Sequence, residues 1–521
     1  MKTLISLLLL AATAGLAGCG GKSPSAPAKL PDGIPPILDP GTPVFDYSPA
    51  RGTLVQSPPP VSQSLTQSGL SAAAGRFGSF GAQLMNVAGS PQCGIDIHQI
   101  EYATVGATGE PTHASAALMV PSGSAPACTG KRPLLLYGHG SSAVKDIKMG
   151  SLDPAAPYSQ ASLGLAALFA AQGYVVLAPN YAGYDSSPLP YHPHQIAEQM
   201  GMDMIDAVAA ARKALPKLKV PVLDNGKLFL TGYSEGGYAA MAAHRAMQAA
   251  GISVTASAPS SGTYAQAAQF EALLGQPNLL YAGGLAGAEN MLGMAIQFTA
   301  WQKAYGNLYA SPSELYSDPW AASMETLAPI ASSAIPGLGS KLPPFLMSKD
   351  LPNVPALSTA EQAMYGTPAT SLLKTSYFVR LLADIAAVPC PATSNGDPLA
   401  CPSSHAMRRA WFKNDLRSWT PTAPMLMCGG HGDGKVPFMN AQLTAAYFQA
   451  HGVAAGLVSV LDVDSASTAN DPYAAAKASF AGARQIIIAS GGNPDSVENY
   501  HGFTAFSGCS VAARDFFARY Q

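Results

Sequence analysis

Short apolar runs alternate with amphipathic stretches from about residue 95 onward. Two early runs, 98–105 and 114–120, have the length of strands. Four later runs read as short buried strands: 133–137, 174–178, 227–231 and 253–258. The stretches with helical spacing between them are 162–172, 196–218 and 237–249. This alternation predicts an α/β fold, in which a mainly parallel sheet carries helices on both faces.

The alternation breaks between about residues 263 and 420, where the chain is rich in Pro and aromatic residues and favours helix. It resumes with apolar runs at 423–428 and 456–463 around a helical stretch at 440–451. The expected parts are a first α/β core segment at 61–262, a mostly helical cap insertion at 263–420 and a second core segment at 421–521. Five aromatic residues could line a cleft or form the core of this cap: Trp301, Tyr305, Tyr309, Tyr316 and Trp320.

The first 18 residues have the pattern of an export signal, with Lys2 before an apolar stretch and small residues before Cys19. The apolar stretch is shorter than the roughly 20 residues that a membrane-spanning helix needs. Leu16-Ala-Gly-Cys19 resembles the lipobox of bacterial lipoproteins, which implies cleavage before Cys19, acylation of that cysteine and a membrane anchor. Gly20 resembles the sorting pattern for the outer membrane, and ordinary secretory cleavage is the alternative. Residues 19–60 are rich in Pro, Ser and Gly and read as a tether.

The composition and net charge exclude some classes of protein. The chain has 521 residues, of which 48% are hydrophobic and 12% charged, so it can bury a large core. Its net charge is -2 and it contains no Lys/Arg-rich block, which argues against a nucleic-acid partner.

Six cysteines follow Cys19, and an even number in an exported chain favours disulfides. Six cysteines allow fifteen pairings. Proximity along the chain suggests Cys93 with Cys128 and Cys390 with Cys401, which leaves Cys428 with Cys509. The spacings lack a Cys-x-x-Cys pair, so we expect no metal site.

A candidate nucleophile follows the apolar run at 227–231, in the sequence Gly232-Tyr-Ser234-Glu-Gly236, and a helical stretch comes next. In a Gly-x-Ser-x-Gly turn between strand and helix, the glycines remove clashing side chains and the serine hydroxyl is exposed. A Gly/Ser-rich turn without chemistry is the alternative. The strand before and the helix after favour Ser234 as nucleophile.

A serine hydroxyl needs a base to take its proton and a carboxylate to orient that base, and in this type of sheet they follow as Asp or Glu and then His. His501 lies after the last predicted strand, whereas His244, His405 and His451 fall in helices or in the expected cap. We therefore predict His501 as the base.

For the acid, Gly-His-Gly-Asp433-Gly-Lys-Val-Pro directly follows the predicted strand at 423–428. Catalytic groups of such sheets lie at the carboxyl ends of strands. We predict Asp433, with Asp462 and Asp464 as the next candidates.

Negative charge on the substrate oxygen requires backbone donors, the oxyanion hole. One expected donor is the N–H of Glu235, directly after the nucleophile. The second is expected from Gly138-His-Gly-Ser141, with Ser141 ahead of Gly140. His139 is expected to brace this loop, and the Glu235 carboxylate to be solvated or salt-bridged.

With these motifs, residues 95–521 resemble the α/β-hydrolase superfamily, and within it the secretory lipases and bacterial lipase-like esterases. Gly-Tyr-Ser234-Glu-Gly-Gly, the strand end Pro179-Asn-Tyr-Ala-Gly183 and the large insertion carry the resemblance, although that group often has Asp where this chain has Asn180. The resemblance implies a serine carboxylic-ester hydrolase that works through an acyl-enzyme without metal or cofactor. Its substrate would be an ester with apolar or aromatic acyl or alkyl groups.

Three other functions stay open. A peptidase or amidase could use the same triad, although the chain has no recognisable propeller-like N-terminal domain. An acyltransferase would result if water were excluded from the acyl-enzyme. A non-catalytic surface-binding lipoprotein could be built on the same fold.

Overall fold

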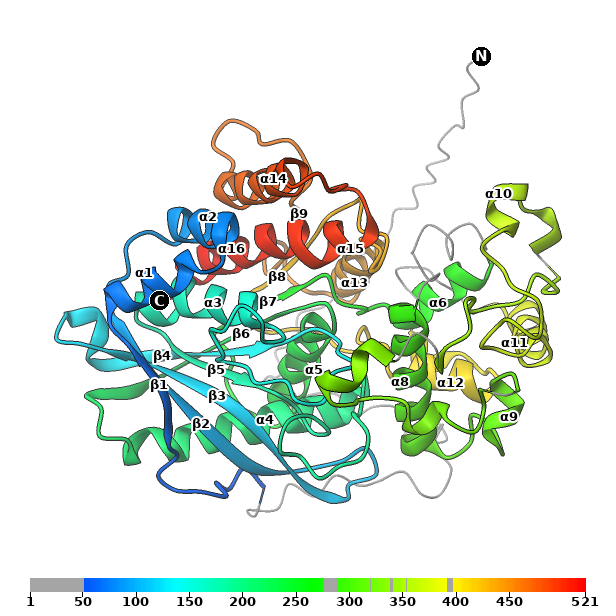
Figure 1. The fold of residues 1–521 in the computed structure, drawn as a ribbon, viewed down its shortest axis with the longest axis horizontal. Coiled ribbons are helices and arrows are strands. Elements are labelled where there is room, and N and C mark those ends of the chain that lie inside the picture. Colours follow the sequence, from blue (N-terminus) through cyan, green and yellow to red (C-terminus); the bar gives the residue numbers. More distant parts are fainter. Residues whose placement is uncertain (1–50, 276–287, 319, 338–340, 353, 391–396) are drawn as a thin grey trace, which may run out of the picture. The chain divides into compact units, whose positions relative to one another are not determined.

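The core of the protein is a nine-stranded sheet with the strand order β1-β2-β3-β5-β4-β6-β7-β8-β9 (Figure 1). The computed structural model describes residues 51–521 except 276–287, 319, 338–340, 353 and 391–396. The predicted signal at 1–18, Cys19 and most of the tether lie outside these residues. No helix in the described part of the chain is both long and apolar enough to span a bilayer.

The strands are β1 (Val61–Leu65), β2 (Gly94–Val105), β3 (Pro111–Ser122), β4 (Gly130–Gly138), β5 (Val175–Pro179), β6 (Val222–Tyr233), β7 (Ala256–Ser260), β8 (Met425–Gly429) and β9 (Val458–Asp462). β1, β2, β3 and β5 pair antiparallel, and all pairs from β5 through β4 to β9 are parallel. The predicted α/β fold with a mainly parallel sheet is therefore confirmed.

The apolar pattern located most strands because β5, β7 and β8 are buried along their whole length. Such strands read as continuous apolar runs. The structure differs from these predictions at two strands. β7 begins three residues later than the predicted strand at 253–258. β1 was not predicted because it is an edge strand whose side chains are largely exposed.

Helices cover both faces of the sheet (Figure 1). They are α1 (Gln67–Gly75), α2 (Gly78–Ala88), α3 (Ser159–Leu168), α4 (Ala197–Ala214), α5 (Glu235–Ala249), α13 (Met439–Ala450), α14 (Ala474–Ala489), α15 (Val497–Asn499) and α16 (Phe506–Phe517). On one face α4 packs against α5, and on the other α16 contacts β6, β7 and β8 with α14 outside it. α1, α2, α14 and α16 were not among the predicted elements.

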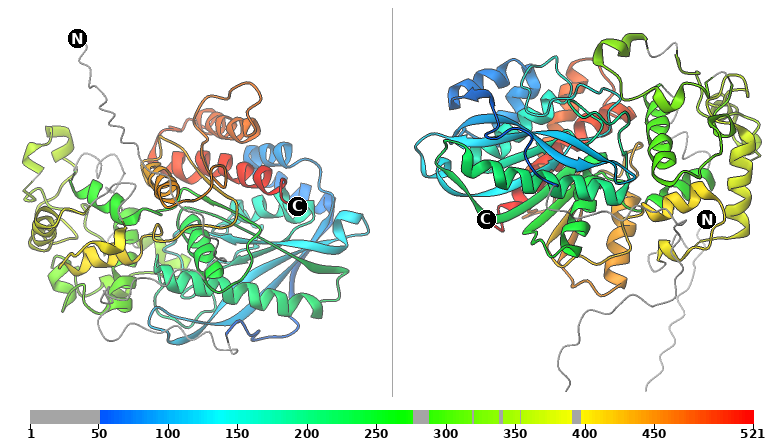
Figure 2. Two further views of the ribbon diagram at one scale, coloured as in Figure 1. Left: turned by 180° about the vertical axis from the view of Figure 1, so that it is seen from behind. Right: turned by 90° about the horizontal axis from the view of Figure 1, so that it is seen from below.

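Between β7 and β8 the described residues add no strand to the sheet. This segment forms α6 (Gln266–Gly275), α8 (Ala288–Tyr305), α9 (Pro312–Leu315), α10 (Thr359–Gln362), α11 (Thr375–Ala387) and α12 (Ala406–Lys413), which gather beside the sheet (Figure 2). They surround a hydrophobic core separate from that of the sheet. Trp301, Tyr309 and Tyr316 are buried in this second core, which favours the core reading for those three aromatic residues.

The six described cysteines form the three suggested disulfides, Cys93–Cys128, Cys390–Cys401 and Cys428–Cys509. The first joins the start of β2 to the segment before β4, and the second lies within the helical segment. The third joins β8 to α16 across the sheet core.

Candidate active site

Ser234 occupies the sharp turn between β6 and α5. Its backbone angles are φ 61° and ψ -124°, a conformation that costs energy for a residue with a side chain. The turn is held because the Ser234 N–H donates to the Ser260 carbonyl at the end of β7, at 3.0 Å. The hydroxyl thus stands beyond the carboxyl end of the sheet.

Gly232 and Gly236 are required at this turn because backbone surrounds both of them. A Cβ on Gly236 would lie 1.9 Å from the Gly138 carbonyl oxygen, and one on Gly232 would lie 2.2 Å from the Gly236 carbonyl oxygen. The predicted reason for the motif, that side chains would clash, is therefore confirmed.

The three residues predicted for catalysis meet in one hydrogen-bonded chain. The His501 Nε2 atom lies 2.9 Å from the Ser234 Oγ atom, and its Nδ1 atom lies 2.8 Å from the Asp433 Oδ2 atom. Asp433 and His501 are 4% and 5% exposed, so water competes little for these bonds. His501 lies in a π-helical turn (Tyr500–Ala505) that leads into α16.

The Asp433 carboxylate is oriented by the loop that carries it. Its Oδ1 atom accepts the backbone N–H groups of Lys435 at 3.0 Å and Val436 at 2.9 Å. Since Oδ1 is occupied in this way, Oδ2 is directed to His501. Both oxygens of this buried carboxyl group therefore have hydrogen-bond partners, as a buried polar group requires.

The other two acid candidates are placed differently. Asp462 contacts the exposed His431 ring at 2.8 Å. Asp464 accepts the Tyr500 hydroxyl at 2.7 Å, and that hydroxyl in turn accepts the Gly432 N–H at 3.0 Å. Asp464 therefore braces the loop before Asp433, and neither candidate hydrogen-bonds to His501.

The loop Gly138–Ser141 lies against Ser234, because a Cβ built on Gly140 would be 3.5 Å from the Ser234 Cβ. Tyrosine hydroxyls hold the loop carbonyls: Tyr181 donates to His139, Tyr158 to Gly140 and Ser141, and Tyr184 to Ser142. These loop carbonyls are therefore all held by hydrogen bonds. The Glu235 N–H lies in the first turn of α5, where the helix itself supplies no acceptor for a backbone N–H.

His139 is fully buried and stacks on Tyr181, with ring centroids 4.2 Å apart. Its ring nitrogens lie 2.7 Å from the Gly140 carbonyl and 3.2 Å from the Asn180 carbonyl. This agrees with the expected bracing role. Asn180, where the resembling group often has Asp, is also structural: its amide donates to Ser115 and accepts the Met149 N–H.

The Glu235 side chain is buried rather than solvated, and two histidines that sequence reasoning missed surround it. Its carboxylate lies 2.6 Å from His192 Nε2 and 3.3 Å from His194 Nε2. Burial by itself would raise the pKa of Glu235, but its interactions with His194 and His192, including the His192 hydrogen bond, outweigh burial and lower that pKa to about 2. The carboxylate is therefore ionised. No local motif marks His192 or His194, because their partner is 41 to 43 residues away.

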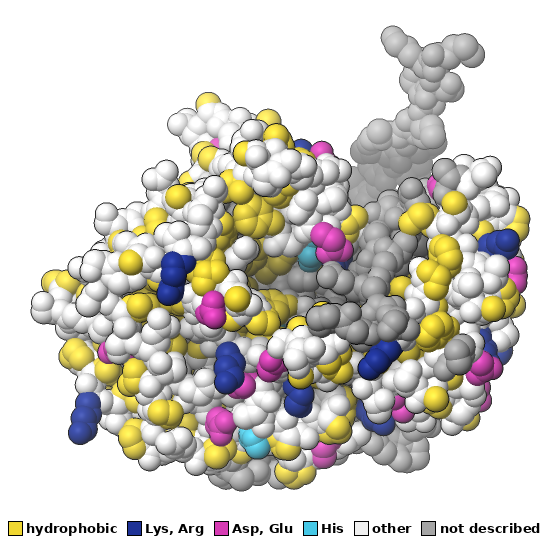
Figure 3. Space-filling view, viewed as in Figure 1, with side chains coloured by type: hydrophobic (Ala, Val, Ile, Leu, Met, Phe, Trp, Pro, Cys, Tyr) yellow, Lys and Arg dark blue, Asp and Glu magenta, His cyan; other side chains and the backbone are white. Residues whose placement is uncertain are grey.

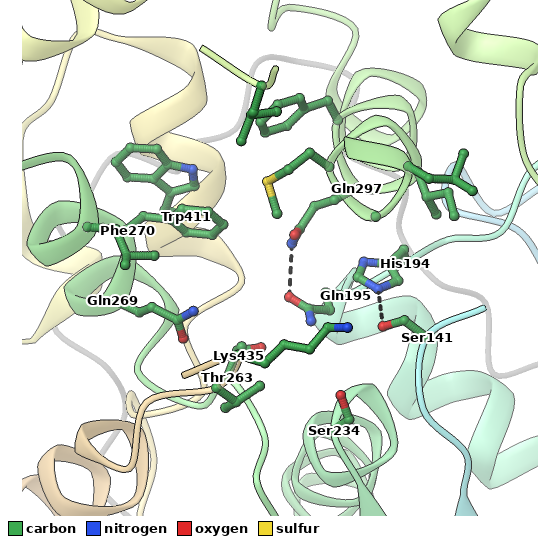
Figure 4. A pocket seen from close by; sticks show the side chains of 18 of the residues that line it. Ser141, His194, Gln195, Ser234, Thr263, Gln269, Phe270, Gln297, Trp411 and Lys435 are labelled. Atoms are coloured by element: carbon green, nitrogen blue, oxygen red, sulfur yellow. Dashed lines mark hydrogen bonds between the residues drawn. The ribbon is translucent and has the colours of Figure 1, made fainter. Parts of the chain in front are cut away.

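A cavity of about 490 Å³ opens beside Ser234 (Figure 4). Its floor carries Ser141, His194, Gln195 and Lys435, and its far wall is apolar and comes from α6, α8, α11 and α12. In the close-up, Phe270 and Trp411 stack on one side, and the Gln195 and Gln297 amides bond to each other at 2.9 Å. The cavity suits a largely apolar ligand.

The face drawn in Figure 3 carries scattered charged side chains of both signs and no broad patch of either sign. Within the described residues, no group of three His, Cys, Asp or Glu side chains is placed to hold a metal ion.

Sequence comparison links the turn region to a known family. Residues 160–266, which include Ser234, match the prolyl oligopeptidase family, Peptidase_S9. No curated protein matches the chain.

Solved structures extend the similarity to nearly the whole chain. A ligand-bound form of the rice cell wall degrading esterase LipA from Xanthomonas oryzae shares 26% identity at a TM-score of 0.64, covering 91% of this chain and 100% of that one. Another structure of this esterase shares 28% identity at 0.59, covering 80% and 91%. A candidate hydrolase from Legionella pneumophila, at 18% identity and 0.56, covers 79% and 91% and shares the fold. The chain therefore has the α/β-hydrolase fold and is similar to serine hydrolases of the esterase and lipase group.

Proposed function

We propose that this protein is a serine carboxylic-ester hydrolase with Ser234 as nucleophile, His501 as base and Asp433 as the acid that orients it. The observation that carries the proposal is the hydrogen-bonded chain Asp433–His501–Ser234 beside an apolar cavity. This order of groups is the one that activates a serine hydroxyl.

In the first step the Ser234 Oγ atom attacks the ester carbonyl carbon, and its proton moves to the His501 Nε2 atom. The carbonyl electrons move to the substrate oxygen, where the N–H groups of Glu235 and of Ser141 or Gly140 stabilise the charge. The intermediate then collapses, and the alcohol leaves with the proton from His501.

The second step repeats this sequence with water. His501 takes a proton from water, the hydroxide attacks the acyl carbon, and Ser234 leaves with the proton as the acid is released. Asp433 fixes the His501 tautomer, with Nδ1–H toward the carboxylate, and stabilises the imidazolium. The chain's own residues suffice for each proton transfer.

Two observations favour esters. The similarity to an esterase covers 91% of the chain, whereas the peptidase family matches only residues 160–266 around the turn. The cavity wall is also apolar and suits an acyl or alkyl chain. A peptidase or amidase with the same triad is the second candidate, since the family match favours it.

We also propose that the protein is exported and anchored by a lipid on Cys19. The three disulfides support export, because disulfides persist in oxidising compartments. The lipobox-like sequence ending at Cys19 supports the anchor. Mass spectrometry of the mature N-terminus tests this: a diacylglyceryl Cys19 is expected, and an unmodified terminus elsewhere would contradict it.

The test of the enzymatic proposal is hydrolysis of p-nitrophenyl esters from acetate to palmitate by the wild type and by Ser234→Ala. Loss of turnover in Ser234→Ala is expected, with Ser313→Ala, an exposed serine, as the matched control. A fluorophosphonate probe should label Ser234 as well. If a folded Ser234→Ala variant kept its activity, the proposal would be wrong, and amide turnover in the absence of ester turnover would select the peptidase.

A further inference from the structure

One imidazole connects the side chains of the two residues proposed as oxyanion donors. The His194 Nε2 atom lies 2.9 Å from the Ser141 Oγ atom and 3.3 Å from the Glu235 Oε2 atom. Figure 4 shows the His194–Ser141 bond at the cavity floor, near Ser234. The backbone of Ser141 and that of Glu235 come from different loops, so their separation depends on what holds those loops together.

The Glu235 end of this connection is rigid. Glu235 is 1% exposed and begins helix α5, where a negative side chain is stabilised by the helix dipole. Its Oε1 atom is held by His192, whose other ring nitrogen lies 2.9 Å from the Ala182 carbonyl. A buried carboxylate is costly unless its partners are in place, so this group resists displacement.

The proton positions follow from the partners. A bare Nε2 lone pair beside the Glu235 carboxylate would be repelled, so Nε2 of His194 carries the hydrogen; it donates this hydrogen to Ser141 and lies 3.3 Å from the Glu235 Oε2 atom without a hydrogen bond to it. Burial lowers the pKa of His194 to about 4, which keeps the ring neutral at pH 7. Ser141 is therefore the acceptor, and its position is tied to that of His194.

We propose that His194 is a positioning residue that sets the spacing of the oxyanion donors by bridging Ser141 to the Glu235 carboxylate. The inference rests on the proposed serine-hydrolase function and deepens it. His194 touches neither the nucleophile nor the base by hydrogen bond; it acts through the backbone of Ser141. Misplacing a catalytic group by about 1 Å can cost about 10²-fold in rate.

A double-mutant cycle tests the bridge. His194→Leu and Ser141→Ala each remove one side of the hydrogen bond and leave the Ser141 N–H in place. Each is expected to lower kcat by about 10- to 100-fold with KM changed by less than about threefold, because the charge appears only after substrate binding. The double variant should lose no more than the single variants, since both break one contact.

Two further variants separate positioning from folding. His194→Gln retains an N–H donor near the Nε2 position and should recover most of kcat. His244→Leu removes an equally buried histidine that bonds to Ser257 away from the site, and it should leave kcat unchanged. Affinity for a trifluoromethyl ketone, whose adduct places an oxyanion in the hole, should fall in His194→Leu in parallel with kcat.

The outcomes also separate this inference from the function itself. If the losses in His194→Leu and Ser141→Ala multiply, or if kcat is unchanged in the folded variants, the bridge is wrong while the esterase stands. If the wild type hydrolyses no ester, the rate of fluorophosphonate labelling at Ser234 replaces kcat. An unchanged labelling rate in His194→Leu would then overturn the bridge, and a reduced rate would uphold it.

Discussion

Cys428 and Cys509 form a disulfide that joins the two segments on which Asp433 and His501 stand. Cys428 lies in β8, five residues before Asp433, and Cys509 lies in α16, eight residues after His501. The two cysteines are 81 residues apart in the sequence. A covalent link so near the Asp433–His501 hydrogen bond limits how far these two side chains, the proposed acid and base, can separate.

Replacing both Cys428 and Cys509 by Ala should lower the free energy of unfolding by about 2–5 kcal/mol, because the unfolded chain regains loop entropy. It should also lower kcat at temperatures well below the midpoint of unfolding. The control is Cys93→Ala with Cys128→Ala, which opens a disulfide outside the site and should cost stability alone. Urea unfolding and ester turnover measure the two effects, and equal loss of kcat in both variants would contradict the prediction.

Asp433→Asn should reduce kcat by about 10²- to 10⁴-fold, because an amide neither stabilises the His501 imidazolium nor holds its tautomer. Asp464→Asn should cost less than about tenfold, since an Asn oxygen can still accept the Tyr500 hydroxyl. Steady-state turnover of one ester compares them. If Asp464→Asn were the more damaging change, the acid would have been misassigned.

Gly236→Ala should abolish soluble folded protein or activity, because its Cβ would lie 1.9 Å from the Gly138 carbonyl oxygen. Gly164→Ala is the matched control: it lies within helix α3, with open space around a Cβ. There the change should raise stability by about 0.5–1 kcal/mol. Thermal unfolding and turnover of both variants check this, and a tolerated Gly236→Ala would show that the turn can open.

Because His244 is buried, the free energy of unfolding should depend on pH in the acid range. Burial lowers the pKa of His244 from 6.5 to about 4, so between these values the unfolded chain binds a proton that the folded chain does not. Stability therefore falls as pH decreases from 6.5 toward 4, by about 1.4 kcal/mol per pH unit at most, and levels off below 4. Urea unfolding of wild type and His244→Leu at pH 7 and 5 should show a shallower pH slope in the variant; identical slopes would argue against a buried neutral ring.

Leu292→Trp should shorten the accepted acyl chain, because Leu292 is buried in α8 and lines the cavity. The kcat/KM for palmitate esters should fall by at least about tenfold while that for acetate changes little. Val379→Trp, on the exposed side of α11, is the control. A uniform loss across the ester series would indicate that the acyl chain lies elsewhere.

The motif around Ser234 was predictable because its physics is local. A strand, five residues with glycines at both ends and a helix are contiguous, and the clash between a Cβ on Gly232 and the Gly236 carbonyl oxygen lies within that turn. Asp433 could be singled out for the same reason, since the Lys435 and Val436 N–H groups that bind its carboxylate follow it directly in the sequence. His501 was predicted from its position after Asp433 and after the last predicted strand.

Other features depended on packing between distant segments. The apolar pattern could not decide whether Trp301 and Tyr316 line a cleft or a core, because both places favour aromatic residues; the structure buries both. It also gave no sign of β1, whose side chains are exposed.

The sequence by itself determined the Gly-x-Ser-x-Gly turn at Ser234, the α/β alternation and the cysteine count, because each is a property of neighbouring residues or of composition. Only the tertiary structure brought His192 and His194 onto Glu235, and Ser141 onto His194. These residues lie on separate connections of the sheet, and no local pattern encodes their meeting. Their contacts arise because strands far apart in the sequence end side by side at the carboxyl edge of one parallel sheet.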